Sequence, residues 1–201
     1  TIFPAMLNAG ATFDPQLVEA MSDIISEETA AVGIRQALSP VMDLARDPRW
    51  GRVYETFGED PYLVSQMSIA YVRAMQQHKT DGVLATAKHF LGYSETQAGL
   101  NTAATHLTDR ELYEYFATPF EAAIKEADLA AIMTSYSEID GIPCGANPKI
   151  VRQLLRQTMG FDGLVVSDGA AVWKLFDTFH VAATYDEAGL LGIKEIGRAS
   201  C

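Results

Sequence analysis

Four short apolar runs, separated by longer segments with helical periodicity, constrain the fold of this chain most strongly. Each run is almost continuously apolar rather than alternating, as expected of strands in a parallel sheet that is covered on both faces. The runs occupy residues 37–42, 83–87, 130–133 and 164–166. Strand and helix alternate at intervals of roughly 30 to 50 residues, which is the βαβ rhythm of an α/β protein.

The segments between the runs carry start signals for helices. Asp14 and Asp60 each precede a proline, so a capping carboxylate is followed by a residue suited to the first helical position. Thr108 and Glu111 have the spacing of a capping box, and Asn147 precedes another proline. We therefore expect helices over residues 17–32, 62–77, 109–125 and 148–157.

Two architectures share this rhythm: an open doubly wound sheet and a (β/α)8 barrel. No Gly-x-Gly-x-x-Gly segment and no P-loop follows any of the runs, so a nucleotide-binding sheet has little support. Polar residues gather after each run, at the edge where barrel enzymes place their active sites. We expect an α/β fold, namely an incomplete (β/α)8 TIM-like barrel with parallel strands alternating with helices.

The composition argues against several classes of function. The chain has 26 acidic and 15 basic residues, a net charge of −11, and so lacks the basic surface of a nucleic-acid or anionic-membrane binder. It has no stretch of about 18 consecutive apolar residues, so we expect no membrane span. Its two cysteines, Cys144 and Cys201, form neither a disulfide framework nor a metal-ligand spacing. An enzyme or small-ligand binder without metal or other cofactor is expected.

Charged and aromatic side chains follow the four apolar runs. They are Asp43 and the Arg-Asp-Pro-Arg-Trp-Gly-Arg segment at 46–52, then Lys88 and His89, then Tyr136, and finally Asp168. These groups suit a neutral, hydroxyl-rich ligand, because the cations donate to sugar oxygens. The carboxylate accepts protons from hydroxyls or attacks carbon.

Several of these residues also have a structural interpretation. Arg46 or Arg49 could pair with a neighbouring aspartate, and Trp50 or His89 could simply belong to the core. Asp168 is a stronger functional candidate, because a carboxylate directly after a buried strand costs desolvation energy unless it is paired or used. Spacing alone leaves nucleophile and metal ligand open, although no accompanying cluster of histidines or carboxylates supports a metal.

Taken together, the motifs resemble those of family 3 glycoside hydrolases, the β-glucosidase and β-xylosidase group. The first is the 46–52 segment followed by Tyr-Glu-Thr-Phe-Gly-Glu-Asp-Pro-Tyr at 54–62. The others, in order, are Lys-His-Phe at 88–90, Ser-Tyr-Ser-Glu-Ile-Asp-Gly at 135–141 and Gly-Phe-Asp-Gly-Leu-Val-Val-Ser-Asp at 160–168. The resemblance covers residues 1–194 and implies part of a catalytic TIM barrel.

Position by position, the resemblance implies roles for single residues. Asp168 matches the catalytic nucleophile, and Tyr136 matches a tyrosine beside it. Arg52, Lys88 and His89 match residues that hold the glycone. The implied reaction is a retaining hydrolysis that releases terminal non-reducing β-D-glucose or β-D-xylose through a glycosyl-enzyme on Asp168. The implied substrate is a small oligosaccharide or an aryl or alkyl β-glycoside.

The chain also departs from the family pattern. Gly169 stands where many relatives have a tryptophan, and the nearest tryptophan is Trp173. The segment at 99–101 lacks an arginine that some relatives carry, and the Gly-His-Gly loop of the N-acetylglucosaminidase branch is missing, which favours glucosidase or xylosidase specificity. The family's acid/base residue usually comes from a later region. Four glutamates are candidates by charge alone, and none is assigned: Glu55, Glu59, Glu95 and Glu138.

The end of the chain reads as foreign sequence. Residues 195–201, Glu-Ile-Gly-Arg-Ala-Ser-Cys, match the in-frame translation of a common sequencing adapter, so we expect a non-native tail there and a partial barrel domain over 1–194. We expect the chain to be inactive on its own. Two alternatives remain for the function: a non-catalytic carbohydrate-binding relative, and another barrel hydrolase that uses Asp168 as a base. Compartment and oligomeric state stay open.

Overall fold

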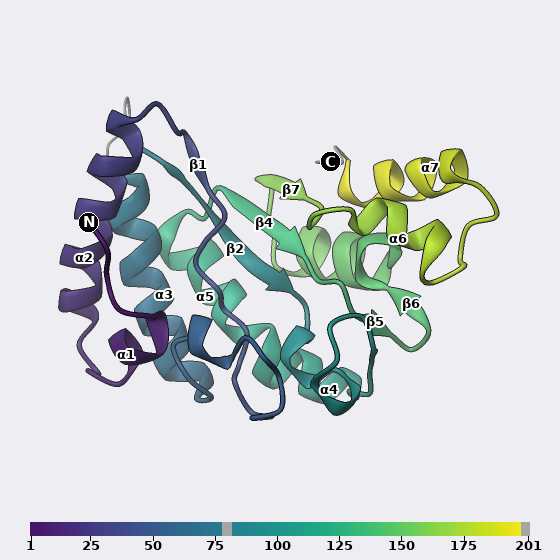
Figure 1. Ribbon diagram of the computed structural model, residues 1–201, viewed down its shortest axis with the longest axis horizontal. Coiled ribbons are helices and arrows are strands. Elements are labelled where there is room, and N and C mark those ends of the chain that lie inside the picture. Colours follow the sequence, from purple (N-terminus) through teal and green to yellow (C-terminus); the bar gives the residue numbers. More distant parts are fainter. Residues whose placement is uncertain (78–81, 198–201) are drawn as a thin grey trace.

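The computed structural model describes residues 1–77 and 82–197. Its centre is a four-stranded parallel sheet in the order β1-β2-β4-β7, in which each strand is added to the same side of the one before (Figure 1). The strands are β1 Gln36–Ala37, β2 Leu84–Phe90, β4 Ala131–Thr134 and β7 Leu164–Val166. A doubly wound sheet reverses its strand order, whereas a barrel wall does not. The predicted barrel-type α/β architecture is therefore confirmed, as an open part of a barrel.

Helices lie between successive strands and cover the sheet (Figure 1). The main ones are α2 Pro15–Ala31, α3 Pro61–Gln76, α5 Thr118–Ala127 and the π-type helix η6 Lys149–Thr158. The predicted caps are present: Asp14 accepts hydrogen bonds from the N–H groups of Gln16 and Leu17, and Asp60 accepts one from Leu63. Helix α3 packs against both α2 and α5, so its side chains are buried around most of its length.

The helix predicted over 109–125 is not continuous. The capping box of Thr108 and Glu111 opens a short helix, α4 Asp109–Glu111. A wider π-type turn, η4 Leu112–Phe116, follows before α5, and the N–H of Ala117 donates to the carbonyl of Leu112 over 2.8 Å. Pro119 has no N–H to donate to the preceding turn, which explains why the regular pattern breaks there.

The first predicted strand, 37–42, is also shorter than expected. Regular pairing with β2 ends at Ala37, and Pro40 lies where a further strand residue would need an N–H donor. The chain nevertheless continues along β2: Val41 bridges to Lys88, and the N–H of Met42 donates to the Lys88 carbonyl over 2.6 Å. The segment therefore still reaches the carboxyl end of the sheet.

A second, three-stranded sheet was not expected from the sequence. It comprises β3 Ala104–Thr105, β5 Glu138–Ile139 and β6 Ile142–Pro143. Two-residue strands are too short to produce a periodic signal, so the pattern could not reveal them. The remaining elements are α1 Met6–Gly10, α6 Ala171–Asp177, α7 Tyr185–Ile196 and the single turns η1 Val53–Glu55, η2 Tyr93–Glu95, η3 Gln97–Gly99 and η5 Cys144–Ala146.

The core lies between the sheet and its helices. The ring of Phe90 in β2 meets the ring of Phe120 in α5 edge to face, with centroids 5.1 Å apart. Within residues 1–77 and 82–197, no helix has the length and apolar content needed to cross a lipid bilayer. Of the tail predicted at 195–201, Glu195 and Ile196 form the end of α7, and 198–201 lie outside the described residues.

Candidate functional site

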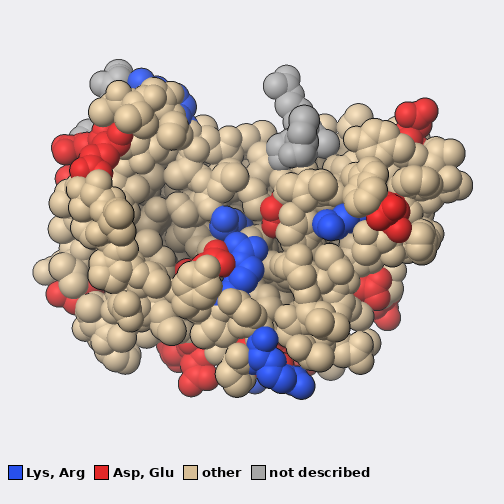
Figure 2. Space-filling model, in the orientation of Figure 1, with Lys and Arg blue, Asp and Glu red and all other residues tan. Residues whose placement is uncertain are grey.

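The carboxyl ends of the parallel strands bring the predicted residues to one edge of the sheet. Lys88 and His89 come just before Phe90, the last residue of β2, Tyr136 follows β4, and Asp168 follows β7. Arg52 reaches the same edge from the loop before η1. Figure 2 shows basic side chains gathered with acidic ones at a hollow in the middle of this face. Each predicted site residue is therefore brought into a single group.

His89 is fixed from two directions. Its backbone N–H and its ring Nδ1 lie 2.9 and 2.8 Å from the same carboxylate oxygen, Oδ2 of Asp43. Tyr93 packs against the imidazole with the two ring centroids 4.9 Å apart. His89 is thus buried, as its structural interpretation required, but its Nε2 has no hydrogen-bond partner within residues 1–77 and 82–197. A buried nitrogen left open in this way is available to a ligand.

Asp168 presents one carboxylate oxygen in the same direction. Its Oδ1 accepts a hydrogen bond from the N–H of Gly169 over 2.7 Å. Its Oδ2 is buried, lies 3.7 Å from His89 Nε2 and has no hydrogen-bond partner among the described residues. The side chain as a whole is 17% exposed, so the carboxylate is accessible although it is largely enclosed. Such a group can act as a nucleophile or as a base.

Tyr136 lies beside this carboxylate. Its hydroxyl donates to the carbonyl of Gly169 over 2.6 Å. Burial, with a smaller contribution from the negative charge of Asp168, raises the pKa of Tyr136 to about 12. The phenol therefore keeps its proton at neutral pH and remains a donor next to Asp168.

A cationic pair completes the site. Arg52 forms a bidentate ion pair with Glu55, in which Nε and Nη2 donate to the two carboxylate oxygens over 2.7 and 2.8 Å. The bond lowers the pKa of Glu55 and raises that of Arg52. Burial and the nearby charge of Arg52 lower the pKa of Lys88, while Asp168 opposes the shift. A cavity of about 230 Å³ reaches Lys88 and Glu55 and is also lined by Tyr54.

The sequence did not single out Tyr93 as a site residue. Its ring touches three neighbours edge to face, Trp50, His89 and Tyr136, with centroid distances of 5.3, 4.9 and 6.0 Å. Its hydroxyl donates to Asn101, and burial raises its pKa to about 12. Tyr93 lies three residues beyond β2, so its position near a strand end was the available signal.

Other members of the 46–52 segment have structural roles. Trp50 is only 2% exposed and packs on Tyr93, so it belongs to the core. Arg49 forms an ion pair with Asp47, as its structural interpretation predicted. The guanidinium of Arg46 lies 5.4 Å from the centroid of the Tyr115 ring, rather than near Asp168.

The glutamates considered for acid/base catalysis do not fit that role in the described part of the chain. Glu55 is close to Lys88 and His89, but Arg52 holds it ionised, and a general acid must carry a proton. Burial raises the pKa of Glu95, but the charges that act on it are those of Arg46 and of two carboxylates other than Asp168. Glu59 is exposed, and Glu138 lies in the small sheet.

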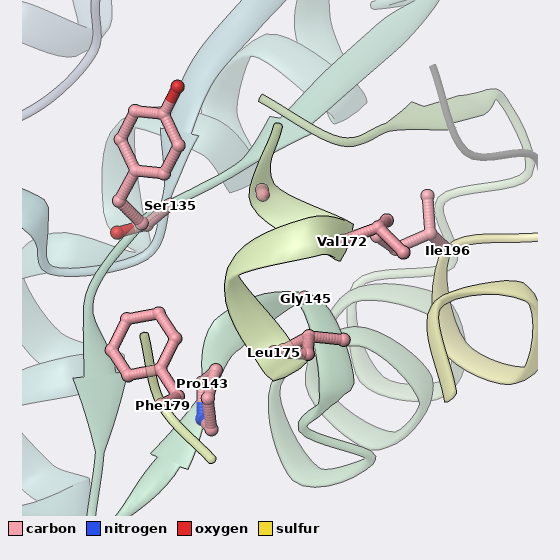
Figure 3. A pocket seen from close by; sticks show the side chains of 9 residues that line it. Ser135, Pro143, Gly145, Val172, Leu175, Phe179 and Ile196 are labelled. Atoms are coloured by element: carbon pink, nitrogen blue, oxygen red, sulfur yellow. The ribbon is translucent and has the colours of Figure 1, made fainter. Parts of the chain in front are cut away.

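Neighbouring cavities do not form a second site of this kind. A pocket of about 10 Å³ behind Tyr136 is lined mainly by apolar side chains, including Pro143, Leu175 and Phe179, and has room for about one water molecule (Figure 3). A cavity of about 520 Å³ lies over the small sheet and the start of η6, away from Asp168. Within residues 1–77 and 82–197, no group of three or more His, Cys, Asp or Glu residues is arranged to hold a metal ion.

Comparisons with known proteins show which family the chain resembles. The profile of the glycosyl hydrolase family 3 N terminal domain matches residues 1–193. A β-xylosidase of Formosa agariphila is 38% identical over 96% of this chain and 28% of its own length. A lysosomal β-glucosidase of Dictyostelium discoideum is 36% identical over 94% of this chain and 24% of its own length.

Solved structures give the same result. A β-glucosidase from Erythrobacter marinus superimposes with a TM-score of 0.95 and 34% identity, covering 97% of this chain and 26% of that protein. A β-glucosidase from Listeria innocua, in complex with glucose, gives a TM-score of 0.92 and 35% identity, covering 97% and 28%. The chain therefore spans about a quarter of the length of these relatives.

Proposed function

The chain belongs to the family of glycosyl hydrolase family 3 N terminal domains, and from this premise we propose that it carries the nucleophile and glycone subsite of a retaining β-glycosidase. The reaction is hydrolysis of an O-glycosidic bond that releases a terminal non-reducing β-D-glucose or β-D-xylose. The relatives' names, β-xylosidase and β-glucosidase, support these two sugars. The substrate is a small oligosaccharide or an aryl or alkyl β-glycoside.

One observation carries the proposal: Asp168 is a largely enclosed carboxylate, 17% exposed, and one of its oxygens accepts no hydrogen bond from residues 1–77 or 82–197. In the first step that carboxylate forms a bond to the anomeric carbon while the bond from this carbon to the leaving oxygen breaks. A proton from a general acid goes to the leaving oxygen. In the second step the conjugate base of that acid takes a proton from water, the water oxygen attacks the anomeric carbon as the ester bond to Asp168 breaks, and the sugar leaves with its configuration retained.

The neighbours of Asp168 suit a neutral sugar. Lys88 and Arg52 are pure donors and therefore match hydroxyl oxygens, while His89 Nε2 can accept or donate. Tyr136 stays protonated beside the carboxylate; its one proton goes to the Gly169 carbonyl, and its hydroxyl oxygen can accept a hydrogen bond from the sugar. The negative charge of Asp168 partly opposes the lowering of the Lys88 pKa by burial and by Arg52, which supports a cationic Lys88 close to the nucleophile.

A second carboxyl group, about 5 to 5.5 Å from the nucleophile, is needed as acid/base in a retaining enzyme. We propose that Glu55 does not supply it, since Arg52 keeps Glu55 ionised. Its role is to hold the guanidinium in place for the glycone. By the family pattern, the acid/base belongs to a later region of the complete protein, and catalysis needs both parts.

The proposal is tested on the complete protein with p-nitrophenyl β-D-glucoside and β-D-xyloside. Proton NMR of the first-formed product should show the β-anomer. The Asp168→Asn variant should lose on the order of 10⁴-fold or more in kcat, because the nucleophile is gone. Asp162→Asn is the matched control, since it makes the same change at an exposed carboxylate just before β7 and should keep normal turnover. An α-anomeric first product, or an Asp168→Asn variant with normal activity, would refute the assignment.

A further inference from the structure

Asp43 is the one fully buried carboxylate in contact with the predicted glycone residues in the described part of the chain, and neither the family resemblance nor the relatives' names give it a role. Its side chain is 1% exposed, as is that of His89. A buried carboxylate is costly unless its charge is compensated by hydrogen bonds or by a function. The contacts of Asp43 indicate which function.

The fold brings Asp43 to His89 through the irregular first strand. Beyond Pro40 the chain remains hydrogen-bonded to β2. The N–H of Lys88 donates to the Pro40 carbonyl over 3.0 Å, and the N–H of Met42 donates to the Lys88 carbonyl over 2.6 Å. Asp43 is the next residue, so its carboxylate lies at the backbone of His89. One oxygen, Oδ2, then meets both the backbone N–H and Nδ1.

These contacts determine which ring nitrogen of His89 carries a proton. An ionised carboxylate only accepts hydrogen bonds, so the Nδ1 that lies 2.8 Å from Asp43 must be the protonated one. The bond to the backbone N–H prevents the carboxylate from turning away. The imidazole is therefore held in one rotamer, with Nε2 turned towards Asp168.

The distance between His89 and Asp168 allows both to bind one ligand atom that lies beside them. Nε2 and Oδ2 are 3.7 Å apart, which is too long for a direct hydrogen bond, and neither has another partner among the residues that the structure describes. An oxygen placed beside both atoms can lie within about 2.8 Å of each, which is ordinary hydrogen-bond distance. A sugar hydroxyl supplies such an oxygen and also a proton to donate.

We propose that Asp43 is a positioning residue for glycone recognition. Asp43 fixes the Nδ1 proton and the orientation of the His89 ring. As a result, His89 Nε2 and Asp168 Oδ2 can both form hydrogen bonds to the same glycone hydroxyl. The inference rests on the proposed function for the sugar itself. The orientation of His89 stands independently of it.

The first test reads the imidazole directly. Nitrogen-15 spectra of the histidine rings in the complete protein, with His89 assigned from a His89→Gln variant, should show a protonated Nδ1. In Asp43→Ala this defined state should be lost. A His89 ring with an unprotonated Nδ1 in the unaltered protein would overturn the inference. Because this measurement needs no turnover, it decides the orientation even if the protein hydrolyses no glycoside.

The second test uses monodeoxy glycosides. The unaltered enzyme should prefer the parent p-nitrophenyl glycoside over one deoxy analogue, the one lacking the bridged hydroxyl, by roughly 10- to 100-fold in kcat/KM. In Asp43→Ala, which removes the acceptor for Nδ1, this preference should fall to about 3-fold or less, while preferences at the other hydroxyls persist. Asp60→Asn, which keeps a helix cap, is the control and should keep all preferences.

A purely structural role for Asp43 gives a different result. It would lower kcat/KM for the parent and for every deoxy analogue by the same factor, and that outcome would overturn the inference. Retention of the full preference in Asp43→Ala would overturn it as well. A protein that binds and hydrolyses no glycoside would refute the proposed function, with the nitrogen-15 spectra still deciding the role of Asp43.

Discussion

His89 Nε2 and Asp168 Oδ2 face each other across 3.7 Å, at the ends of two strands, and neither atom has a hydrogen-bond partner in the described part of the chain. Unpaired buried polar atoms each cost about 1–3 kcal/mol, so a fold rarely holds two together without a use for them. The sequence places both residues after buried strands of one parallel sheet. Their juxtaposition is therefore a consequence of the fold and the starting point for the chemistry.

Glu55 should help to keep Lys88 protonated, in addition to holding Arg52 in position. The charge of Glu55 raises the pKa of Lys88 and partly opposes the effects of burial and of Arg52. Glu55→Gln removes that charge, so the pKa of Lys88 should fall further. The alkaline limb of the profile of kcat/KM against pH should move to lower pH, with a loss of about 10-fold at neutral pH. An unchanged alkaline limb would show that the charge of Glu55 does not influence the pKa of Lys88.

The Arg52–Glu55 pair also gives a prediction for stability. Arg52 lowers the pKa of Glu55 below its ordinary value of 4.5 in the folded state. The stabilisation is therefore fully present above pH 4.5 and is lost as the pH falls through the lower, folded-state value. At neutral pH the free energy of unfolding of the unaltered protein should be about 0.2–1 kcal/mol larger than that of Glu55→Gln. The difference is small because both groups of the ion pair are partly exposed.

Urea unfolding of both proteins over a pH series measures this difference. It should shrink towards zero in acid. A difference that stays constant down to the acid end would show that the glutamine change acts through packing rather than through charge.

Gly163 should be required for the start of β7. A Cβ atom there would lie 2.5 Å from the carbonyl oxygen of Ala130 and 2.7 Å from the ring of Phe161. Gly163→Ala should therefore destabilise the protein by about 1–3 kcal/mol through overpacking. Gly189, within α7, is the matched control, because a Cβ there meets nothing within 4 Å. Gly189→Ala should stabilise by up to about 1 kcal/mol through helix propensity. Equal effects of the two changes in denaturant titrations would contradict the close approach at Gly163.

Much of the site could be predicted because strand ends are visible in sequence. Lys88, Tyr136 and Asp168 each follow an apolar run, and the structure gathers them as expected. The contact of Asp43 with His89 spans 46 positions and depends on how the chain rejoins β2 after Pro40. No local pattern encodes such a contact.

Local sequence patterns also failed at specific elements. Pro40 shortens the first strand and Pro119 breaks the third helix, in both cases because proline removes an N–H donor that a periodicity argument assumes. Tyr93 was missed because its importance lies in packing against three rings from different loops. Such tertiary packing overrides a hydropathy pattern rather than following from it.

The most direct test of the central claim is covalent trapping of the nucleophile. The complete protein is incubated with an activated 2-deoxy-2-fluoro β-glycoside, digested, and its peptides are mapped by mass spectrometry. The unaltered protein should carry a single fluoroglycosyl group on Asp168. The Asp162→Asn control should be labelled to the same extent, and Asp168→Asn should remain unlabelled. Labelling of any other carboxylate, or full hydrolysis without any trapped peptide, would contradict the assignment of Asp168.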